Sequence, residues 1–169
     1  MSLVVENGSG LSNAESYVFV VDCDAYHVAH GNTPTGITVT DKEIALRLAT
    51  QYLEARYVGQ WIGTRINSTM SLSWPRFNAE DPDGYWIESN IIPQRLKDAT
   101  CELALRKIQG DTLVADISEP GTVSAESVTV GPISTSTSYT GGKSQTKQYS
   151  IVDRLIGPLI ESGSRLVRA

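Results

Sequence analysis

The sequence predicts a mainly α fold: a small helical bundle with a β-hairpin or small antiparallel sheet and an extended C-terminal docking segment. Two stretches, 40–57 and 93–110, repeat apolar side chains at the spacing of one helix face. A third stretch, 123–139, alternates β-branched or aromatic residues with small ones, which is typical of strands. The helices are therefore expected to form the body of the protein and the strands an addition to it.

The chain length of 169 residues suits a single domain with a sizeable core. Within it we expect a helical core at about 12–112, a β-hairpin arm at about 121–141 and a C-terminal docking segment at about 149–169. A content of 40% hydrophobic and 20% charged residues is ordinary for a globular protein. The longest apolar run, Tyr17 to Val21, is too short to span a membrane, so no membrane partner is expected.

The N-terminal part predicts one short helix. Residues 12–15 have the spacing of a capping box, but β-branched and aromatic residues follow, so only a turn is expected there. The first helix should occupy about 21–30 and stop at Gly31.

The strongest helix is expected to begin at Thr40, the N-cap of a capping box with Glu43, and to end near Tyr57. Its buried face should centre on one apolar stripe with a flank of smaller residues beside it. The stripe is Ile44, Leu48, Tyr52 and Ala55, and the flank is Ala45, Ala49 and Leu53.

Residues 58–92 are predicted to be irregular, because glycine and proline recur along them. They hold all three tryptophans, which either pin this loop onto the helices or serve as interface anchors. Trp74, Pro75 and Arg76 are the interface candidates: proline biases Trp74 toward an extended backbone, and Arg76 is a natural partner for a carboxylate.

Two further helices are expected towards the C-terminus. One starts with Pro93 in its first turn and stops at Gly110. The other runs from Ser150 to about Ile160, where Pro158 shortens or kinks it.

The hairpin at 123–139 carries a single charge, Glu126. Two strands alone are marginally stable in water, and an uncharged edge lacks the usual protection against pairing. It therefore needs a partner, and we predict that Val4-Val5 pairs with one of its strands in the same or a neighbouring subunit. Its interface candidates are Val128, Val130, Ile133 and Tyr139.

The C-terminal segment combines an apolar stripe with positive charge. Residues 143–169 contain five Lys or Arg against two acidic residues, which is 5 − 2 = +3. A short amphipathic piece of this kind is suited to folding onto a partner, so deletion of 149–169 is expected to leave a folded protein that no longer docks. The candidate residues are Ile151, Arg154, Leu155, Leu159 and Arg165, with Ile156 completing the stripe.

Candidate chemistry is sparse. The net charge of −5 argues against a protein that grips nucleic acid phosphates. The sequence around Lys143 lacks the first glycine of a phosphate loop, and no nucleophile motif or complete calcium loop is present. We therefore predict no catalytic residue, no cofactor and no enzymatic activity.

One cluster has metal-ligand spacing. Cys23, His27 and His30 fall on one face of the first helix, and Cys101 could add a fourth ligand. Free cysteines are, however, commonly small core residues, so no metal is predicted. Two cysteines are also too few for a disulfide framework, which favours a reducing compartment.

Six stretches, taken in order, resemble one protein family. They are SNAESYV (12–18), DAYHVAHG (24–31), TQYLEARYVGQWIGTR (50–65), LSWPR (72–76), IPQRLKDATCELALR (92–106) and VTVGPI (128–133). The family is that of the small head–tail connector (adaptor) proteins of long-tailed double-stranded-DNA bacteriophages. Its sequences often carry the label "DnaT-like single-stranded-DNA-binding protein". Phe19 is a departure, because members usually have a small polar residue there as a helix start.

The resemblance implies a virion structural protein made in the cytoplasm of a bacterial host. Such subunits form a ring of about a dozen copies below the portal of the DNA-filled head. The implied partners are other copies of the chain, the portal protein and the next neck or tail-completion protein. DNA would be only a non-specific cargo in the channel that the ring extends.

Two other functions stay open. A true single-stranded-DNA binder needs a basic groove interleaved with aromatic residues, and Arg56-Tyr57, Trp61 and Arg65 are the local approximation to one. A small metal-dependent enzyme would centre on Cys23 and its two histidines. Salt-titrated DNA binding tests the first and metal analysis tests the second.

Overall fold

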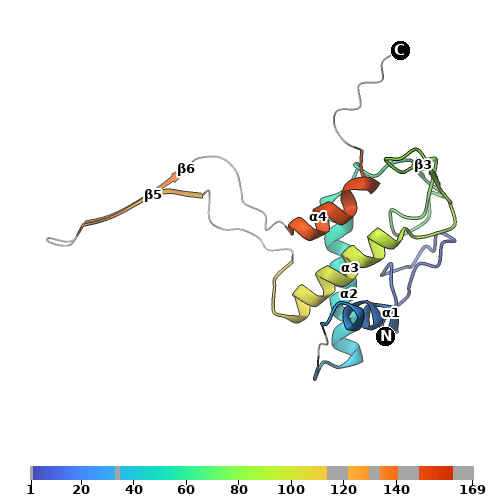
Figure 1. Cartoon of the computed structure of the whole chain (residues 1–169), viewed down its shortest axis with the longest axis horizontal. Helices are drawn as coiled ribbons and strands as arrows, with labels where there is room; N and C mark the ends of the chain where they lie inside the picture. Colours follow the sequence, from blue (N-terminus) through green and yellow to red (C-terminus); the bar gives the residue numbers. More distant parts are fainter. Residues whose placement is uncertain (1, 33–34, 114–121, 130–133, 141–148, 162–169) are drawn as a thin grey trace, which may run out of the picture. The chain divides into compact units, whose positions relative to one another are not determined.

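The computed structural model describes residues 2–32, 35–113, 122–129, 134–140 and 149–161 (Figure 1). Contacts divide the chain into two compact units. The first contains the described residues up to Leu113 and from Tyr149 onwards, and it holds all the helices of the described ranges. The second contains the hairpin strands that were predicted as an arm. The predicted mainly α fold is confirmed.

Helix α1 spans Val20–Ala29, close to the expected bounds. Phe19 is its N-cap, with extended backbone and no side-chain hydrogen bond, and its carbonyl accepts from the amide of Cys23 at 3.0 Å. The helix therefore starts without a polar side chain at its N-cap. Gly31 follows with φ +73°, a conformation that glycine adopts without strain, and it ends the helix as predicted.

Helix α2 spans Val39–Arg56 and starts earlier than predicted. The N-cap is Thr38, whose hydroxyl accepts from the Asp41 amide at 3.1 Å and donates to the Asp41 carboxylate at 2.7 Å. The prediction of Thr40 as N-cap is wrong because the sequence offers two overlapping caps. The earlier one gains a reciprocal Thr38–Asp41 pair at the helix start.

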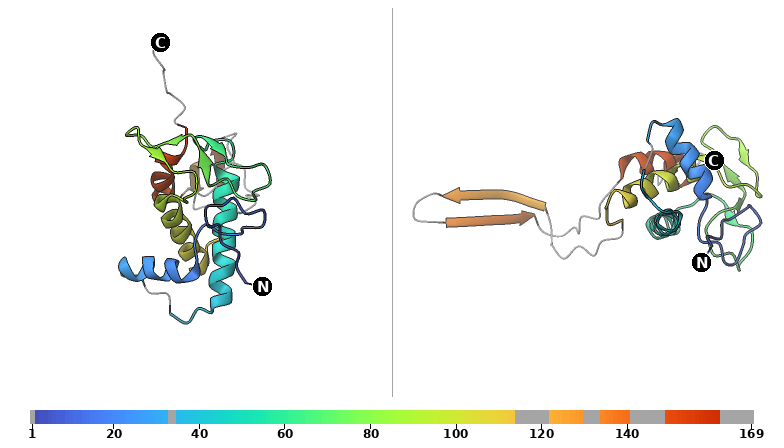
Figure 2. Two further views of the ribbon diagram at one scale, coloured as in Figure 1. Left: turned by 90° about the vertical axis from the view of Figure 1, so that its right-hand side faces the viewer. Right: turned by 90° about the horizontal axis from the view of Figure 1, so that it is seen from below.

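Helix α3, Gln94–Ile108, packs against α2, and the two run side by side in Figure 2. Pro93 is its N-cap residue, and Gly110 follows the helix with φ +98°. The buried face of α2 differs from the predicted stripe: Ile44 is 45% exposed, whereas Ala49 is fully buried. The predicted flank is thus the centre of the face, because its alanines let the two helices approach closely.

The last helical segment consists of α4, Ser150–Ile156, and the 3₁₀ helix η1, Gly157–Leu159. Pro158 ends the α-helix as expected, because a proline cannot continue the hydrogen-bond ladder. Val152 and Ile156 are fully buried, and α4 packs against α3. None of the helices in the described ranges has the length and apolarity of a membrane span.

The region between α2 and α3 contains two small antiparallel sheets of two strands each. In one, β1 (Thr64–Arg65) pairs with β2 (Arg76–Phe77). In the other, β3 (Ala79–Glu80) pairs with β4 (Trp86–Ile87). The predicted irregular loop is therefore partly structured.

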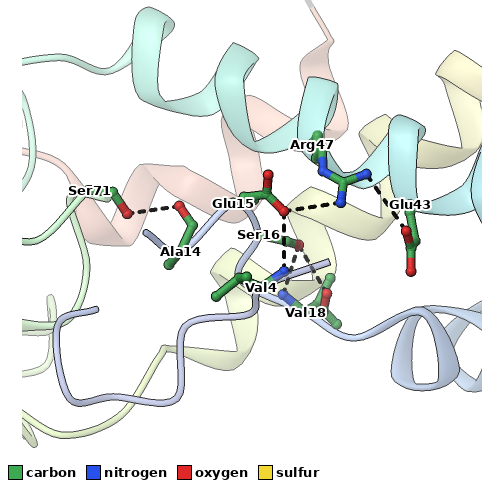
Figure 3. Close-up of polar contacts among 8 residues, drawn as sticks. All are labelled: Val4, Ala14, Glu15, Ser16, Val18, Glu43, Arg47 and Ser71. Carbon is green, nitrogen blue, oxygen red and sulfur yellow. Dashed lines mark hydrogen bonds and ion pairs between the residues drawn. The ribbon is translucent and has the colours of Figure 1, made fainter. Parts of the chain in front are cut away.

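The N-terminal segment is fixed to α2 through Glu15 (Figure 3). The Glu15 carboxylate accepts from the Val4 amide at 3.2 Å and lies 3.0 Å from the Arg47 guanidinium. The hydrogen bond from Arg47, followed by that from Val4, lowers the pKa of Glu15. Arg47 also reaches Glu43, one helical turn earlier, at 3.7 Å.

Val5 forms a parallel bridge with Ser16, and the Glu6 amide donates to the Ser16 carbonyl at 2.9 Å. Among the described residues, Val4-Val5 is thus paired within its own N-terminal segment, and its pairing with a hairpin strand of a neighbouring subunit stays a prediction. The partners of Val4-Val5 are instead Glu15 and Ser16, whose amides both donate to the Val4 carbonyl. The local partner is favoured because it closes a short loop.

The second unit is an antiparallel ladder of β5, Thr122–Thr129, and β6, Ser134–Thr140. Val123 pairs with Tyr139 and Val128 with Thr135, with an irregularity between Val123 and Ala125. The predicted β-hairpin is confirmed over these ranges.

Candidate interface residues

The motif Trp74-Pro75-Arg76 lies inside the first unit. Trp74 has no exposed surface and Pro75 is fully buried, with a cis peptide bond between them. The Trp74 ring meets Trp61 edge-on at 6.4 Å, and Trp61 meets Tyr57 at 5.6 Å. Trp74 thus pins the loop to the helices of its own unit, and a role for the motif at an interface between chains stays a prediction. The sequence shows that a tryptophan is an anchor but not which surface it contacts.

A polar network holds the backbone of this motif to α2. The hydroxyl of buried Tyr17 donates to the Glu54 carboxylate and accepts from the amides of Ser73 and Trp74, at 3.1 and 3.3 Å. The Ser73 hydroxyl donates to the same carboxylate at 2.6 Å. Burial, and then the charge of Glu54, raises the pKa of Tyr17 far above its usual range. The phenol therefore stays protonated and the network intact at neutral pH.

The sequence suggested a carboxylate as the partner of Arg76. In the described residues, its guanidinium instead donates to backbone carbonyls. Its Nε donates to the Ile62 carbonyl at 2.7 Å, Nη1 to the Ser73 carbonyl at 3.0 Å and Nη2 to the Gly63 carbonyl at 2.8 Å. Gly63 has φ +70°, and a Cβ there would lie 2.3 Å from the Phe77 carbonyl oxygen. The guanidinium group therefore joins the loop segment at 62–63 to the segment at 73–77. A side chain at Gly63 would push these two segments apart.

We expect Arg76→Lys to lower the free energy of unfolding by about 1–3 kcal/mol, because an ammonium cannot reproduce three donors in one plane. Urea denaturation measures the change, with exposed Arg154→Lys as the matched control. Equal midpoints for the two variants would show that the carbonyl contacts contribute nothing.

The C-terminal candidates are distributed between core and surface. Leu159 is buried and Leu155 half-buried, whereas Ile151 is 41% exposed and Arg154 is exposed. Arg165 lies outside the described residues. Residues 149–161 are therefore not a free docking segment but part of the first unit.

Polar contacts reinforce this packing. The Asp153 carboxylate accepts from the Tyr57 hydroxyl at 2.6 Å and from Arg56 Nε at 3.2 Å. Ile62 donates to the Leu159 carbonyl at 3.1 Å. The apolar stripe seen in the sequence is real, but its partner is α3 and the loop after α2.

For the interface candidates in the hairpin, the structure gives the strand and the pairing partner of each described residue. Val128 and Tyr139 lie on β5 and β6, near opposite ends of the ladder. Val130 and Ile133 lie outside the described residues.

The cluster of cysteine and histidine residues does not come together as the sequence suggested. Cys23, His27 and Cys101 are buried, but His30 is exposed and stacks on Tyr26. A hydrogen bond with Cys101, and then the neighbouring His27, lowers the pKa of the Cys23 thiol to about 6 despite its burial. His27 also bonds the Cys101 carbonyl at 3.0 Å. Among the described residues, no group of three such side chains is arranged to hold a metal ion.

The residues that approximated a DNA-binding groove in the sequence make contacts within the first unit instead. Tyr57 and Trp61 are buried, and Arg56 is paired with Asp153. Arg65 donates to the carbonyls of Ser68 and Met70. A cleft of about 320 Å³ beside the N-terminal segment is not basic either, since Asp22 and Glu6 line it with Lys97.

The whole chain, residues 1–169, matches the model of a family described as "Putative DnaT-like ssDNA binding protein". The chain belongs to this DnaT-like family. No curated protein and no solved structure matches it. The predicted resemblance is confirmed as far as the DnaT-like label, and the connector function stays a prediction.

In this DnaT-like chain, sequence reasoning did not single out the two aromatic side chains that are most exposed among the described residues, although it counted Trp86 among the three possible anchors. Tyr85 is 73% and Trp86 67% exposed, at the tip and second strand of the β3–β4 hairpin. The signal was the turn sequence Asp81-Pro82-Asp83-Gly84 directly before them, which predicts a surface hairpin.

Proposed function

We propose that the chain is a virion structural protein, a head–tail connector that forms a ring below the portal and joins the head to the neck or tail. The observation that carries the proposal is the β5–β6 ribbon. Over its described residues it is a two-stranded sheet, with β5 and β6 as each other's partners. A two-stranded hairpin is marginal in water, so it gains stability from a further surface.

The composition of the ribbon supports assembly. Glu126 is the one charged residue within 122–129 and 134–140, and no lysine protects either outer edge. Such edges add strands or pack on apolar surfaces of other chains. The candidate occupants are another copy of this chain and the portal protein.

The charge of the chain suits a channel for DNA. With a net charge of −5, a ring of copies would repel the duplex mildly and let it slide. This role requires no catalytic chemistry and no cofactor. It also places the protein at the head–tail junction of the virion, after synthesis in the bacterial cytoplasm.

The test replaces residues 122–140 by a Gly-Ser linker of equal length. We expect the first unit to melt as in the full chain, because it packs separately from the ribbon. We also expect the variant to lose ring formation, measured by light scattering, and attachment to portal-bearing heads. Assembly equal to that of the full chain would refute the role of the ribbon.

Single-stranded-DNA binding is the second candidate, and the family description favours it over the connector. The exposed rings of Tyr85 and Trp86 could stack on bases. The charges oppose it, because residues 77–94 contain four acidic residues and no lysine or arginine.

Fluorescence anisotropy with a labelled oligothymidylate, titrated with salt, separates the two functions. A connector is expected to show no saturable binding at physiological salt. Tight binding that weakens with salt and is lost in Tyr85→Ala/Trp86→Ala would establish the DNA-binding function instead.

A further inference from the structure

The packing of α1 on α3 brings the two cysteines of the chain together. Cys23 lies in the first turn of α1 and Cys101 in the middle of α3, and both are buried. Two hydrogen bonds fix the helices beside them. His27 Nε2 donates to the Cys101 carbonyl at 3.0 Å, and the Tyr26 hydroxyl donates to the Glu102 carboxylate at 3.0 Å. The two thiols therefore meet at a defined contact between α1 and α3.

The two thiols differ in acidity because a hydrogen bond joins them. That bond is the main cause that lowers the pKa of Cys23 to about 6. The same bond, and then burial, raises the pKa of Cys101. Near neutral pH, Cys23 is therefore a thiolate and Cys101 keeps the proton that it donates to Cys23. A thiolate is the nucleophilic form of cysteine, and a neighbouring thiol can resolve its oxidised form into a disulfide.

A small cavity gives an oxidant access to Cys23. Its volume is about 10 Å³, which is room for one water-sized molecule. Cys23 and His27 line it together with Lys42 and Asp24, whose ammonium and carboxylate lie 2.8 Å apart. The Asp24 side chain is 40% exposed, so the cavity lies close to solvent. Among the described residues, Cys101 does not line this cavity, so a small oxidant that enters it reaches Cys23 first.

We propose that Cys23 and Cys101 form a disulfide when the protein meets a hydroperoxide. The Cys23 sulfur attacks one oxygen of hydrogen peroxide, the O–O bond breaks, and a sulfenic acid forms while hydroxide leaves. The hydroxide takes up a proton from solvent. The Cys101 sulfur then displaces the hydroxyl group of the sulfenic acid, which leaves with the Cys101 proton as water. In sum, two thiols are oxidised to a disulfide and hydrogen peroxide is reduced to two water molecules.

The disulfide connects α1 covalently to α3. In a reducing compartment, which the two cysteines favour, a disulfide of this kind is transient and responds to oxidants. It closes the long loop between Cys23 and Cys101 and so restricts the unfolded chain, which stabilises the folded protein. The inference concerns the helical unit alone and does not rest on the connector function.

The experiment treats the reduced full-length protein with hydrogen peroxide and measures its intact mass and its free thiols. We expect both thiols to disappear, the mass to fall by two hydrogen atoms, and the chain to run as a monomer in a non-reducing denaturing gel. Dithiothreitol should reverse all three changes. The oxidised protein should melt about 5–10 °C above the reduced protein.

Serine variants separate the roles of the two cysteines, because a hydroxyl group can replace a thiol in the hydrogen bond between them. In Cys101→Ser, Cys23 should stop at the sulfenic acid and react with dimedone. In Cys23→Ser, Cys101 should lose its thiol about ten-fold more slowly than Cys23 does in Cys101→Ser. Circular dichroism checks that both variants are folded.

Three results would overturn the inference. One is an unaltered chain that keeps its thiols or oxidises further without forming a disulfide. Another is a disulfide found only between chains, as a dimer in the non-reducing gel. The third is an equal rate of thiol loss in the two folded variants. The mass of the unaltered chain decides the question even where a serine variant unfolds.

Discussion

Deletion of residues 149–169 is expected to abolish cooperative folding of the helical unit. The segment contributes Val152, Ile156 and Leu159 to the core, all at most 2% exposed, together with buried Tyr149. Each such side chain stabilises the fold by about 1.5–3 kcal/mol, and their sum approaches the 5–15 kcal/mol of a whole domain. Near-UV circular dichroism and thermal melting measure the loss. This replaces the sequence-based expectation of a folded, docking-deficient protein.

A chain that ends at Glu161 is the matched control, because it keeps α4, η1 and the bond from Glu161 to Gln60. We expect it to melt within a few degrees of the full chain. A sharp, native-like transition in the longer deletion would mean that α4 is dispensable for the core.

Trp74→Ala is expected to lower the free energy of unfolding by about 3–5 kcal/mol, as large-to-small changes at buried aromatic sites do. The ring is fully enclosed and contacts Trp61 edge-on, so its removal leaves a cavity that the bundle cannot close. Urea denaturation followed by circular dichroism measures the change.

Trp86→Ala removes the same atoms from a 67% exposed position and serves as the control. Its effect on stability should stay within about 0.5 kcal/mol. Comparable losses in the two variants would contradict the distinction between anchor and surface ring.

The helices were predictable because their signals are local. Gly31 and Gly110 marked two helix ends, and both adopt the positive φ that such a stop requires. Pro93 marked the start of α3 within one residue. The β5–β6 strands followed from alternation and β-branched composition, which also depend only on near neighbours.

Surface and core could not be told apart in the same way. The rings of Trp74 and Trp86 sit in the same loop, yet one is enclosed and the other exposed. Similarly, the sequence favoured Thr40 as the N-cap of α2, whereas the folded chain uses Thr38, which pairs with Asp41.

The sequence by itself therefore determined the helical elements, their ends and the hairpin, since hydrogen-bonding period and backbone preference are properties of short stretches. The tertiary structure decided what each apolar stripe contacts. The stripe on α4 would suit a partner protein as well as it suits α3, because burial of apolar area is non-directional. Inside the first unit its burial is accompanied by the bonds of Asp153 with Arg56 and Tyr57, residues far from Asp153 in sequence that meet it only in the folded chain.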